Sequence, residues 1–190
     1  MRVVGGRLRG RALNAPASRD IRPTSDRLRE SLFDVLAHRY PDSLEGARVL
    51  DLFAGSGALG IEAISRGAAF ALFVDTGAEA RALIRGNVEE LALGGVTRIW
   101  RADAIRLGHA PAGPPFGLAF LDPPYNQGLA SPALAALVAG GWLAPGALAV
   151  VEEHARADIA APEGLALLDE RVYGDTKLAF YVVGNLDPGG

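Results

Sequence analysis

The sequence predicts an α/β fold built on a mostly parallel sheet. Short runs rich in branched and aromatic residues alternate along its 190 residues with segments that have the apolar spacing of helices. A glycine-rich turn follows the first of the sheet strands, and four consecutive strands end at an aspartate. In a parallel sheet these ends meet at one edge, where such folds bind their ligands.

The charge of the chain is divided unevenly. Residues 1–29 hold eight arginines against two aspartates, a net charge of +6, whereas the remaining residues carry −9 and the whole chain −3. A basic segment on an acidic body predicts that the N-terminal segment binds an anion and that the rest of the protein does not.

Residues 3–13 are predicted to form two short extended pieces separated by glycines. In an extended chain every second side chain points the same way, so one face would carry a row of three arginines: Arg7, Arg9 and Arg11. A guanidinium group can donate two parallel hydrogen bonds to the oxygens of one phosphate, so such a row suits a nucleic-acid backbone. The alternative is an exposed edge strand protected by its charges.

A helix is predicted to begin after Pro23. Thr24 or Ser25 can cap it, and leucine and valine recur beyond them at helical spacing. The backbone N–H groups of its first turn attract anions, so we expect Arg22, Thr24 and Arg27 to contact the same partner as the arginine row. A helix that only packs against the core is the alternative.

The central feature of the chain is a glycine-rich turn between a strand and a helix. Arg48 to Phe53 is too short for a helix and rich enough in branched and aromatic residues to be a buried strand. The turn that follows has the pattern Gly55-x-Gly57-x-x-Gly60, and apolar residues then return at helical spacing. Because glycine has no Cβ, backbone N–H groups and a helix N-terminus stay open to a ligand. We therefore predict a small-molecule site at this turn.

Two kinds of ligand fit the turn. Its glycine spacing matches the dinucleotide fingerprint, and Asp75 follows Gly55 at the ~20-residue interval expected for an acid that holds a ribose. Another adenosine-bearing cofactor would use the same features. Asp51, at the end of the strand, favours this second kind, because a carboxylate repels a pyrophosphate and attracts a cation. S-adenosylmethionine carries both an ammonium and a sulfonium group.

Strands and helices continue to alternate after the turn. The expected strands are Ala69 to Asp75, Thr97 to Asp103, Phe116 to Leu121 and Ala147 to Val151, and the expected helices are Ala78 to Leu93 and Ala133 to Ala139. Two further apolar runs flank Gly174, which predicts an antiparallel hairpin at the sheet edge and seven strands in all. Leu129 to Val151 has no charged residue, but its prolines and glycines divide it, so we expect buried core rather than a membrane span. Residues 185–190 are expected to be a disordered tail.

The fourth strand leads into Asp122-Pro123-Pro124-Tyr125. The two prolines stiffen the backbone, so its carbonyl groups keep a set direction. The Asp122 carboxylate and the Pro123 carbonyl can accept hydrogen bonds from an exocyclic NH₂ group, and Tyr125 can stack on the ring that carries it. We therefore predict a site for a planar amine, in which positioning matters more than a strong base.

The composition excludes several other kinds of site. The chain has no cysteine, and its three histidines have no spacing typical of metal ligands, so we expect neither a thiol nucleophile nor a bound metal. The N-terminus has no apolar signal core, which predicts a cytoplasmic protein.

The two motifs together resemble a known enzyme class. The turn from Asp51 to Gly57 and the tetrapeptide from Asp122 to Tyr125 are similar to the class I S-adenosylmethionine-dependent methyltransferases that act on exocyclic amines of nucleic-acid bases. The N-terminal motifs Val3-Val4-Gly5-Gly6-x-x-Arg9-Gly10-Arg11 and Arg22-Pro23-Thr24-x-Asp26-Arg27 resemble the bacterial RsmD family, which methylates a guanine N2 of 16S rRNA. This resemblance implies a Rossmann-like methyltransferase fold with a small basic N-terminal hairpin and helix. It also implies S-adenosylmethionine as cofactor, and a monomer that acts on rRNA in an assembled or assembling 30S subunit.

The resemblance also implies roles for particular residues. The methionine part of the cofactor would be surrounded by Asp51, Gly55 and Gly57. Asp75 would hold the ribose hydroxyls, and Asp103 would hold the adenine amine. The other expected cofactor contacts are Phe53, Ala54, Ser56 and Ala104. The target guanine would lie against Asp122, Pro123, Pro124 and Tyr125.

Residues 1–40 would then form a basic RNA-binding extension with its helix, and residues 41–184 the methyltransferase domain. Other functions stay open at this point. A DNA adenine-N6 methyltransferase uses the same tetrapeptide, although the chain has no room for a separate target-recognition domain. A dehydrogenase or another dinucleotide-binding protein would use the glycine turn, and a nucleotide- or RNA-binding protein would need no catalysis.

Overall fold

The computed structural model describes residues 1–16 and 25–184, and the structural statements below concern these residues. The predicted RNA contacts Arg22 and Thr24, and the tail predicted at 185–190, lie outside them. The helices and strands, in chain order, are α1 (Asp26–Arg39), β1 (Arg48–Leu52), α2 (Ala58–Ser65), β2 (Phe70–Val74), α3 (Ala78–Glu90), β3 (Thr97–Trp100), β4 (Phe116–Leu121), α4 (Ala130–Ala139), β5 (Leu143–His154), β6 (Leu165–Tyr173) and β7 (Thr176–Val183). Short 3₁₀ helices, η1 to η4, occupy Gly6–Leu8, Pro41–Ser43, Gly94–Val96 and Ala104–Arg106.

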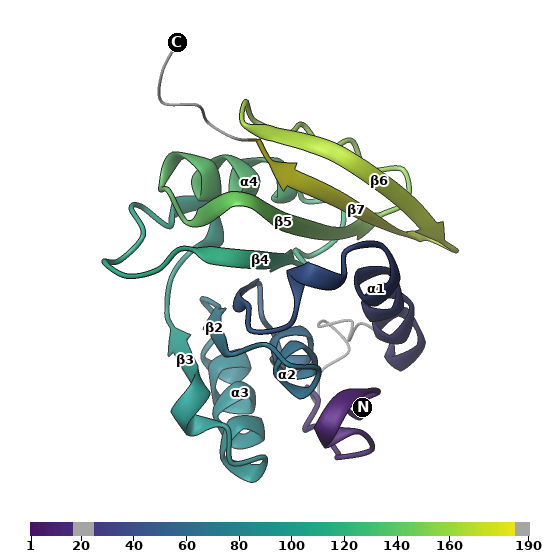
Figure 1. The fold of residues 1–190 in the computed structure, drawn as a ribbon, viewed down its shortest axis with the longest axis vertical. Coiled ribbons are helices and arrows are strands. Elements are labelled where there is room, and N and C mark those ends of the chain that lie inside the picture. The colour runs from purple at the N-terminus through teal and green to yellow at the C-terminus, as the bar shows by residue number, and fades with distance from the viewer. Residues whose placement is uncertain (17–24, 185–190) are drawn as a thin grey trace.

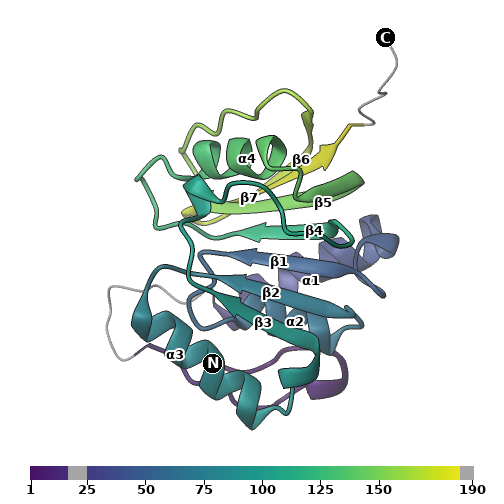
Figure 2. The same cartoon turned by 90° about the vertical axis from the view of Figure 1, so that its left-hand side faces the viewer.

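The strands form one sheet in the order β3-β2-β1-β4-β5-β7-β6. Strands β3, β2, β1, β4 and β5 pair in parallel, whereas β7 is antiparallel to both β5 and β6. Figure 2 shows this order, from β3 near the bottom of the view to β7 and β6 near the top. The predicted fold, a mostly parallel seven-stranded sheet with an antiparallel C-terminal hairpin, is confirmed.

Helices cover both faces of the sheet because the strands are apolar on both sides. Neighbouring residues of a strand point to opposite faces, so Val49 packs with α1, α2 and α3 while Leu50 packs with α4. The uncharged stretch predicted to be core forms α4 and most of β5, and its Trp142 is fully buried. In the described part of the chain, no helix is long and apolar enough to cross a membrane.

Several element boundaries differ from the prediction. Helix α3 ends at Glu90 rather than at Leu93, α4 begins at Ala130 rather than at Ala133, and the largest strand differences are in β3 and β5. Strand β3 ends at Trp100 rather than at Asp103, because the Asp103 side chain turns back to cap η4. Strand β5 extends beyond the predicted Ala147 to Val151 at both ends, because it pairs with β4 on one side and with β7 on the other.

The N-terminal segment turns back on itself beside α1 and α2 (Figure 1). Gly6 and Gly10 have φ angles of +70° and +84°, which residues other than glycine rarely adopt. Residues Gly6–Leu8 form the 3₁₀ helix η1. The prediction of an arginine row on one extended face is therefore wrong, because the backbone is not extended there. The three residues concerned, Arg7, Arg9 and Arg11, are all exposed.

The helix predicted near the N-terminus is present, but the predicted hairpin is not formed by strands. A single antiparallel bridge joins Arg2 to Ala12 and closes the folded segment. Helix α1 begins at Asp26, and the Ser25 side chain accepts a hydrogen bond from the Leu28 N–H at 3.1 Å. Of the two predicted caps, Ser25 is thus the one that the structure supports.

Candidate active site

The two motifs singled out in the sequence meet where the strand order reverses. Strand β1 has β2 on one side and β4 on the other, so the loops that follow β1 and β4 run in different directions and leave room for a ligand. The Asp122 N–H, directly after β4, donates to the Leu52 carbonyl at the end of β1, at 3.4 Å. The structure therefore brings the glycine turn and the Asp122 tetrapeptide together at one edge of the sheet.

Asp51 is a buried carboxylate at this edge. It lies in β1, its side chain is 1% exposed, and its Oδ2 accepts a hydrogen bond from the Gly60 N–H of α2 at 2.9 Å. Burial raises the pKa of Asp51 to about 8, and the negative charge of Asp75 acts in the same direction. Ionisation of the buried Asp51 carboxyl is unfavourable when the carboxyl is alone, and it becomes favourable when a cation lies beside it. The site therefore suits a positively charged ligand.

The turn between β1 and α2 has the left-handed backbone conformations that favour glycine. Gly55 and Gly57 have φ angles of +56° and +79°, and Phe53 also has a positive φ of +57°. The Gly57 N–H donates to the Ala54 carbonyl at 2.7 Å, and Gly57 is the N-cap of α2. Ser56, between the two glycines, is 8% exposed. The turn is thus a compact loop closed by its own backbone hydrogen bond.

Asp75 connects this turn to the next strand. It follows β2 directly, and its Oδ2 accepts a hydrogen bond from the Gly55 N–H at 3.0 Å. Its other oxygen accepts from the Gly77 N–H at 2.7 Å. The acid predicted to hold a ribose therefore lies against the glycine turn, and its contact with a ribose stays a prediction.

Gly60 is the position where the turn tolerates a side chain least. A Cβ at Gly60 would overlap the Phe73 ring and would lie 3.2 Å from Asp51 Oδ2. We expect Gly60→Ala to lower the free energy of unfolding by about 1–3 kcal/mol, because Phe73 and Asp51 are themselves buried and have little room to move. Urea unfolding measures this.

Gly94→Ala is the matched control for Gly60→Ala. Gly94 is exposed, and a Cβ there would have no heavy atom within 4 Å. Its effect should stay within about 0.5 kcal/mol. Equal losses for the two variants would contradict the close packing assigned to Gly60.

Asp103 and Ala104 lie at the beginning of η4, three residues beyond the end of β3. Asp103 Oδ1 accepts a hydrogen bond from the Ile105 N–H at 3.1 Å, and Ala104 is 4% exposed. These bonds do not test the contacts with the cofactor that were predicted for Asp103 and Ala104. Within residues 1–16 and 25–184, no group of three or more histidine, cysteine, aspartate or glutamate side chains is arranged to hold a metal ion.

The tetrapeptide after β4 ends in a ring that two other strands hold in place. Pro123 is buried, Pro124 is exposed, and Asp122 and Tyr125 are partly exposed. The Tyr125 hydroxyl donates to Glu152 Oε1 of β5 at 2.8 Å and lies 2.8 Å from Thr176 Oγ1 of β7. Burial, followed by the negative charge of Glu152, raises the pKa of Tyr125. The ring therefore has a set orientation beside Asp122.

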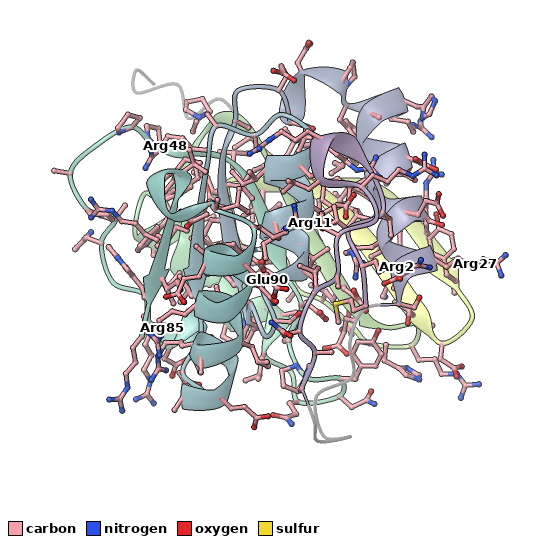
Figure 3. All side chains as sticks on the ribbon, turned by 90° about the horizontal axis from the view of Figure 1, so that it is seen from below. Arg2, Arg11, Arg27, Arg48, Arg85 and Glu90 are labelled. Carbon is pink, nitrogen blue, oxygen red and sulfur yellow. The ribbon has the colours of Figure 1, made fainter. Side chains whose placement is uncertain are left out.

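Two of the predicted arginine contacts, Arg11 and Arg27, are labelled in Figure 3. Arg27 extends from the beginning of α1 near Arg2 of the N-terminal segment, and Arg11 lies against α3, where its Nη2 donates to the Glu90 carbonyl at 3.2 Å. Arg11 and Arg27 therefore lie in different segments of the chain and do not share one extended face.

Several buried polar residues around the site were missed at the sequence level. Glu152 and Thr176 hold Tyr125, Glu62 and Ser65 of α2 bind the N-terminal segment, and Asn87 of α3 binds the glycine turn. Two signals were present: Glu62 is a charged residue inside the otherwise apolar Ala58–Ile64, and Glu152 follows an uncharged strand. Their partners could not be found from spacing, because they lie far away in the sequence.

Comparison with known proteins agrees with this geometry. The family model described as "Conserved hypothetical protein 95" matches residues 1–182. Ribosomal RNA small subunit methyltransferase D of Escherichia coli (strain K12) is 38% identical over 184 residues, which cover 95% of this chain and 89% of that protein. The solved structure of the Escherichia coli protein yhhF has a TM-score of 0.83 and 34% identity, and the match covers 97% of this chain and 98% of that chain.

A more distant structure shares the fold alone. It is an RNA methyltransferase from Salinibacter ruber in complex with S-adenosyl-L-homocysteine, with a TM-score of 0.66 and 15% identity over 89% of this chain and 98% of that chain. The family model and the Escherichia coli relative both span nearly all of the present sequence. The chain therefore belongs to the RsmD family of ribosomal RNA methyltransferases, described as conserved hypothetical protein 95.

Proposed function

We propose that this protein transfers a methyl group from S-adenosylmethionine to the exocyclic N2 amine of one guanine in small-subunit rRNA. The observation that carries the proposal is the hydrogen bond between the Asp122 N–H and the Leu52 carbonyl, which sets an amine-directed tetrapeptide directly beside a turn suited to a cationic cofactor. The rRNA methyltransferase named among the relatives supports the substrate class, and the Salinibacter ruber complex supports the cofactor.

The residues at the glycine turn fit S-adenosylmethionine, which supplies an activated methyl group on its sulfonium when bound. Asp51 is a buried carboxylate that a nearby ammonium would stabilise in its ionised form. A Cβ at Gly55 would meet only the Phe53 carbonyl oxygen within 4 Å, so the backbone leaves space on that side. Asp75 would accept hydrogen bonds from the ribose hydroxyls, since each carboxylate oxygen can accept more than one. Asp103 and Ala104 would contact the adenine.

Asp122 and Pro123 would orient the target amine. Their oxygen atoms accept hydrogen bonds from the two N–H groups, which directs the nitrogen lone pair at the methyl carbon. Bound S-adenosylmethionine would supply this methyl group, with its sulfur as the leaving group, and the methylated amine would release a proton to solvent. Positive charge develops on the nitrogen during transfer, and the Asp122 carboxylate stabilises it.

Tyr125 provides the surface on which the base stacks. Tyr125→Ala should lower kcat/KM for the RNA substrate about 10–100-fold, because stacking of one base contributes about 1–3 kcal/mol. Tyr125→Phe keeps the ring and removes only its hydrogen bonds to Glu152 and Thr176, so its loss should be smaller. Initial rates at limiting subunit concentration give both values. Equal losses in Tyr125→Phe and Tyr125→Ala would assign the role to the hydroxyl instead.

The N-terminal part of the chain would hold the RNA around the target. We assign residues 1–40 to an RNA-binding extension and residues 41–184 to the methyltransferase domain. The backbone contacts are assigned to Arg7, Arg9, Arg11, Arg22, Thr24 and Arg27. A base inside a helix cannot reach Asp122, so the guanine lies in a loop or is flipped out. The protein acts as a monomer in the cytoplasm, on an assembled or assembling 30S subunit.

Methyl transfer with labelled cofactor tests this proposal. The protein and labelled S-adenosylmethionine are incubated in three separate reactions. The first contains small ribosomal subunits lacking the modification, the second naked 16S rRNA and the third duplex DNA. We expect label in the rRNA of the subunits, and nuclease digestion with mass spectrometry should find it as N2-methylguanine. Label in adenine of the DNA, or no label in rRNA, would overturn the proposal.

A further inference from the structure

The N-terminal segment is bound to the helix that begins at the glycine turn. Glu62 of α2 is fully buried, and its two oxygens accept hydrogen bonds from the Val4 N–H at 2.9 Å and the Gly5 N–H at 2.7 Å. Ser65 Oγ accepts from the Leu8 N–H at 2.9 Å and donates to the Gly5 carbonyl at 2.6 Å. These bonds join the proposed RNA-binding segment to α2, whose N-cap, Gly57, belongs to the proposed cofactor site.

The segment is also bound to α3, at its other end. Asn14 Nδ2 donates to Glu90 Oε2 at 3.2 Å, next to the contact between Arg11 and the Glu90 carbonyl (Figure 3). The Asn14 backbone lies against Asn87, whose Oδ1 accepts from the Asn14 N–H at 2.7 Å and whose Nδ2 donates to the Asn14 carbonyl at 3.2 Å.

Asn87 makes one more bond, and that bond reaches the glycine turn. Its Nδ2 donates to the Ser56 carbonyl at 2.9 Å, and the side chain is fully buried. The Ser56 carbonyl and the Gly57 N–H belong to one planar peptide group, and the N–H end of that group is held by the Ala54 carbonyl. Asn87 therefore fixes the other end of the peptide group at the centre of the turn.

We propose that Asn87 is a positioning residue that couples RNA binding to cofactor binding. One buried amide holds both the backbone of the N-terminal segment and the backbone of the cofactor turn, so an arrangement that RNA stabilises in the segment also stabilises the turn. By reciprocity, bound cofactor then strengthens RNA binding by the same factor. This inference rests on the proposed function, which assigns the RNA to the segment and S-adenosylmethionine to the turn.

Asn87→Asp separates this role from simple structural support. Aspartate has nearly the same shape and keeps an oxygen for the Asn14 N–H, but it cannot donate to the Ser56 or Asn14 carbonyls. Asn14→Ala is the matched control, because it removes the side-chain bond to Glu90 and leaves both backbone bonds to Asn87. If thermal unfolding shows that Asn87→Asp does not fold, the same test is made with Asn87→Ser, which introduces no buried charge.

The measured quantity is the Kd of radiolabelled S-adenosylhomocysteine, by equilibrium dialysis, with and without excess unmodified small ribosomal subunits. We expect the subunits to lower this Kd about fivefold or more for the wild type and for Asn14→Ala, and to leave it nearly unchanged for Asn87→Asp. A purely structural residue would lower the unfolding temperature and weaken both Kd values without changing their ratio. A wild-type ratio near one, or a wild-type ratio retained in Asn87→Asp, would overturn the coupling. Failure of the folded wild type to bind S-adenosylhomocysteine at all would instead overturn the proposed function.

Discussion

Asp122→Asn is expected to lower the rate of methyl transfer about 100-fold. Two opposite charges 4 Å apart near a protein surface interact with about 4 kcal/mol, and the target nitrogen becomes positive as it is methylated. Because Asp122 is partly exposed, solvent reduces this to roughly 2–3 kcal/mol, or about two orders of magnitude in kcat. Asparagine keeps one acceptor oxygen, so the loss reports mainly on the charge.

Single-turnover rates on unmodified small subunits, together with the Kd of S-adenosylhomocysteine, test this expectation. The rate should fall while the Kd changes by less than about threefold, because the charge acts on the target amine rather than on the cofactor. Asp42→Asn, at an exposed position in η2, is the control and should keep the wild-type rate. A wild-type rate in Asp122→Asn would mean that positioning by carbonyl oxygens is sufficient.

The sheet could be predicted because its determinants are local in the sequence. Strands such as Phe116–Leu121 are short apolar runs bounded by turn residues, and each is followed by a segment with helical spacing. Parallel strands place their carboxyl ends together, so Asp75 and Asp122 could be assigned to one edge without knowing the distances. The end of β3 was predicted wrongly because Asp103 caps a 3₁₀ helix instead of continuing the strand. The spacing of apolar residues along a strand does not show where its hydrogen bonds to the neighbouring strand end.

The N-terminal segment and the buried polar contacts could not be predicted for a different reason. The arginine row assumed an extended backbone, whereas Gly6 and Gly10 both have positive φ angles and turn the chain. Asn87 contacts residues that lie 73 and 31 positions away in the sequence, and Tyr125 contacts a residue 51 positions away. Periodicity within one helix or strand contains no information about such partners, so only the folded chain identifies them.

Asp51→Asn should stabilise the cofactor-free protein increasingly as the pH rises. Burial raises the pKa of Asp51 from 3.8 to about 8, so between these values the folded protein holds a proton that the unfolded chain releases. The free energy of unfolding of the wild type therefore falls as the pH rises through this window. Asparagine does not titrate, so the free energy of unfolding of the variant minus that of the wild type should grow by up to about 1.4 kcal/mol per pH unit. Urea unfolding at pH 6, 7 and 8 measures this difference, and a difference independent of pH would contradict the raised pKa.

The same substitution should weaken S-adenosylmethionine binding. A cation beside Asp51 favours the ionised carboxylate, so the charge that opposes folding without cofactor becomes an attraction when the cofactor is bound. Removing one partner of a buried charge pair costs about 2 kcal/mol or more, which corresponds to a Kd about 30-fold higher. Calorimetric titration of the cofactor into Asp51→Asn and the wild type gives this ratio. A variant that gained stability at high pH and kept its cofactor affinity would place the ammonium away from Asp51. Loss of affinity together with gain of stability would show that the buried acid is present for binding, at the expense of the stability of the cofactor-free fold.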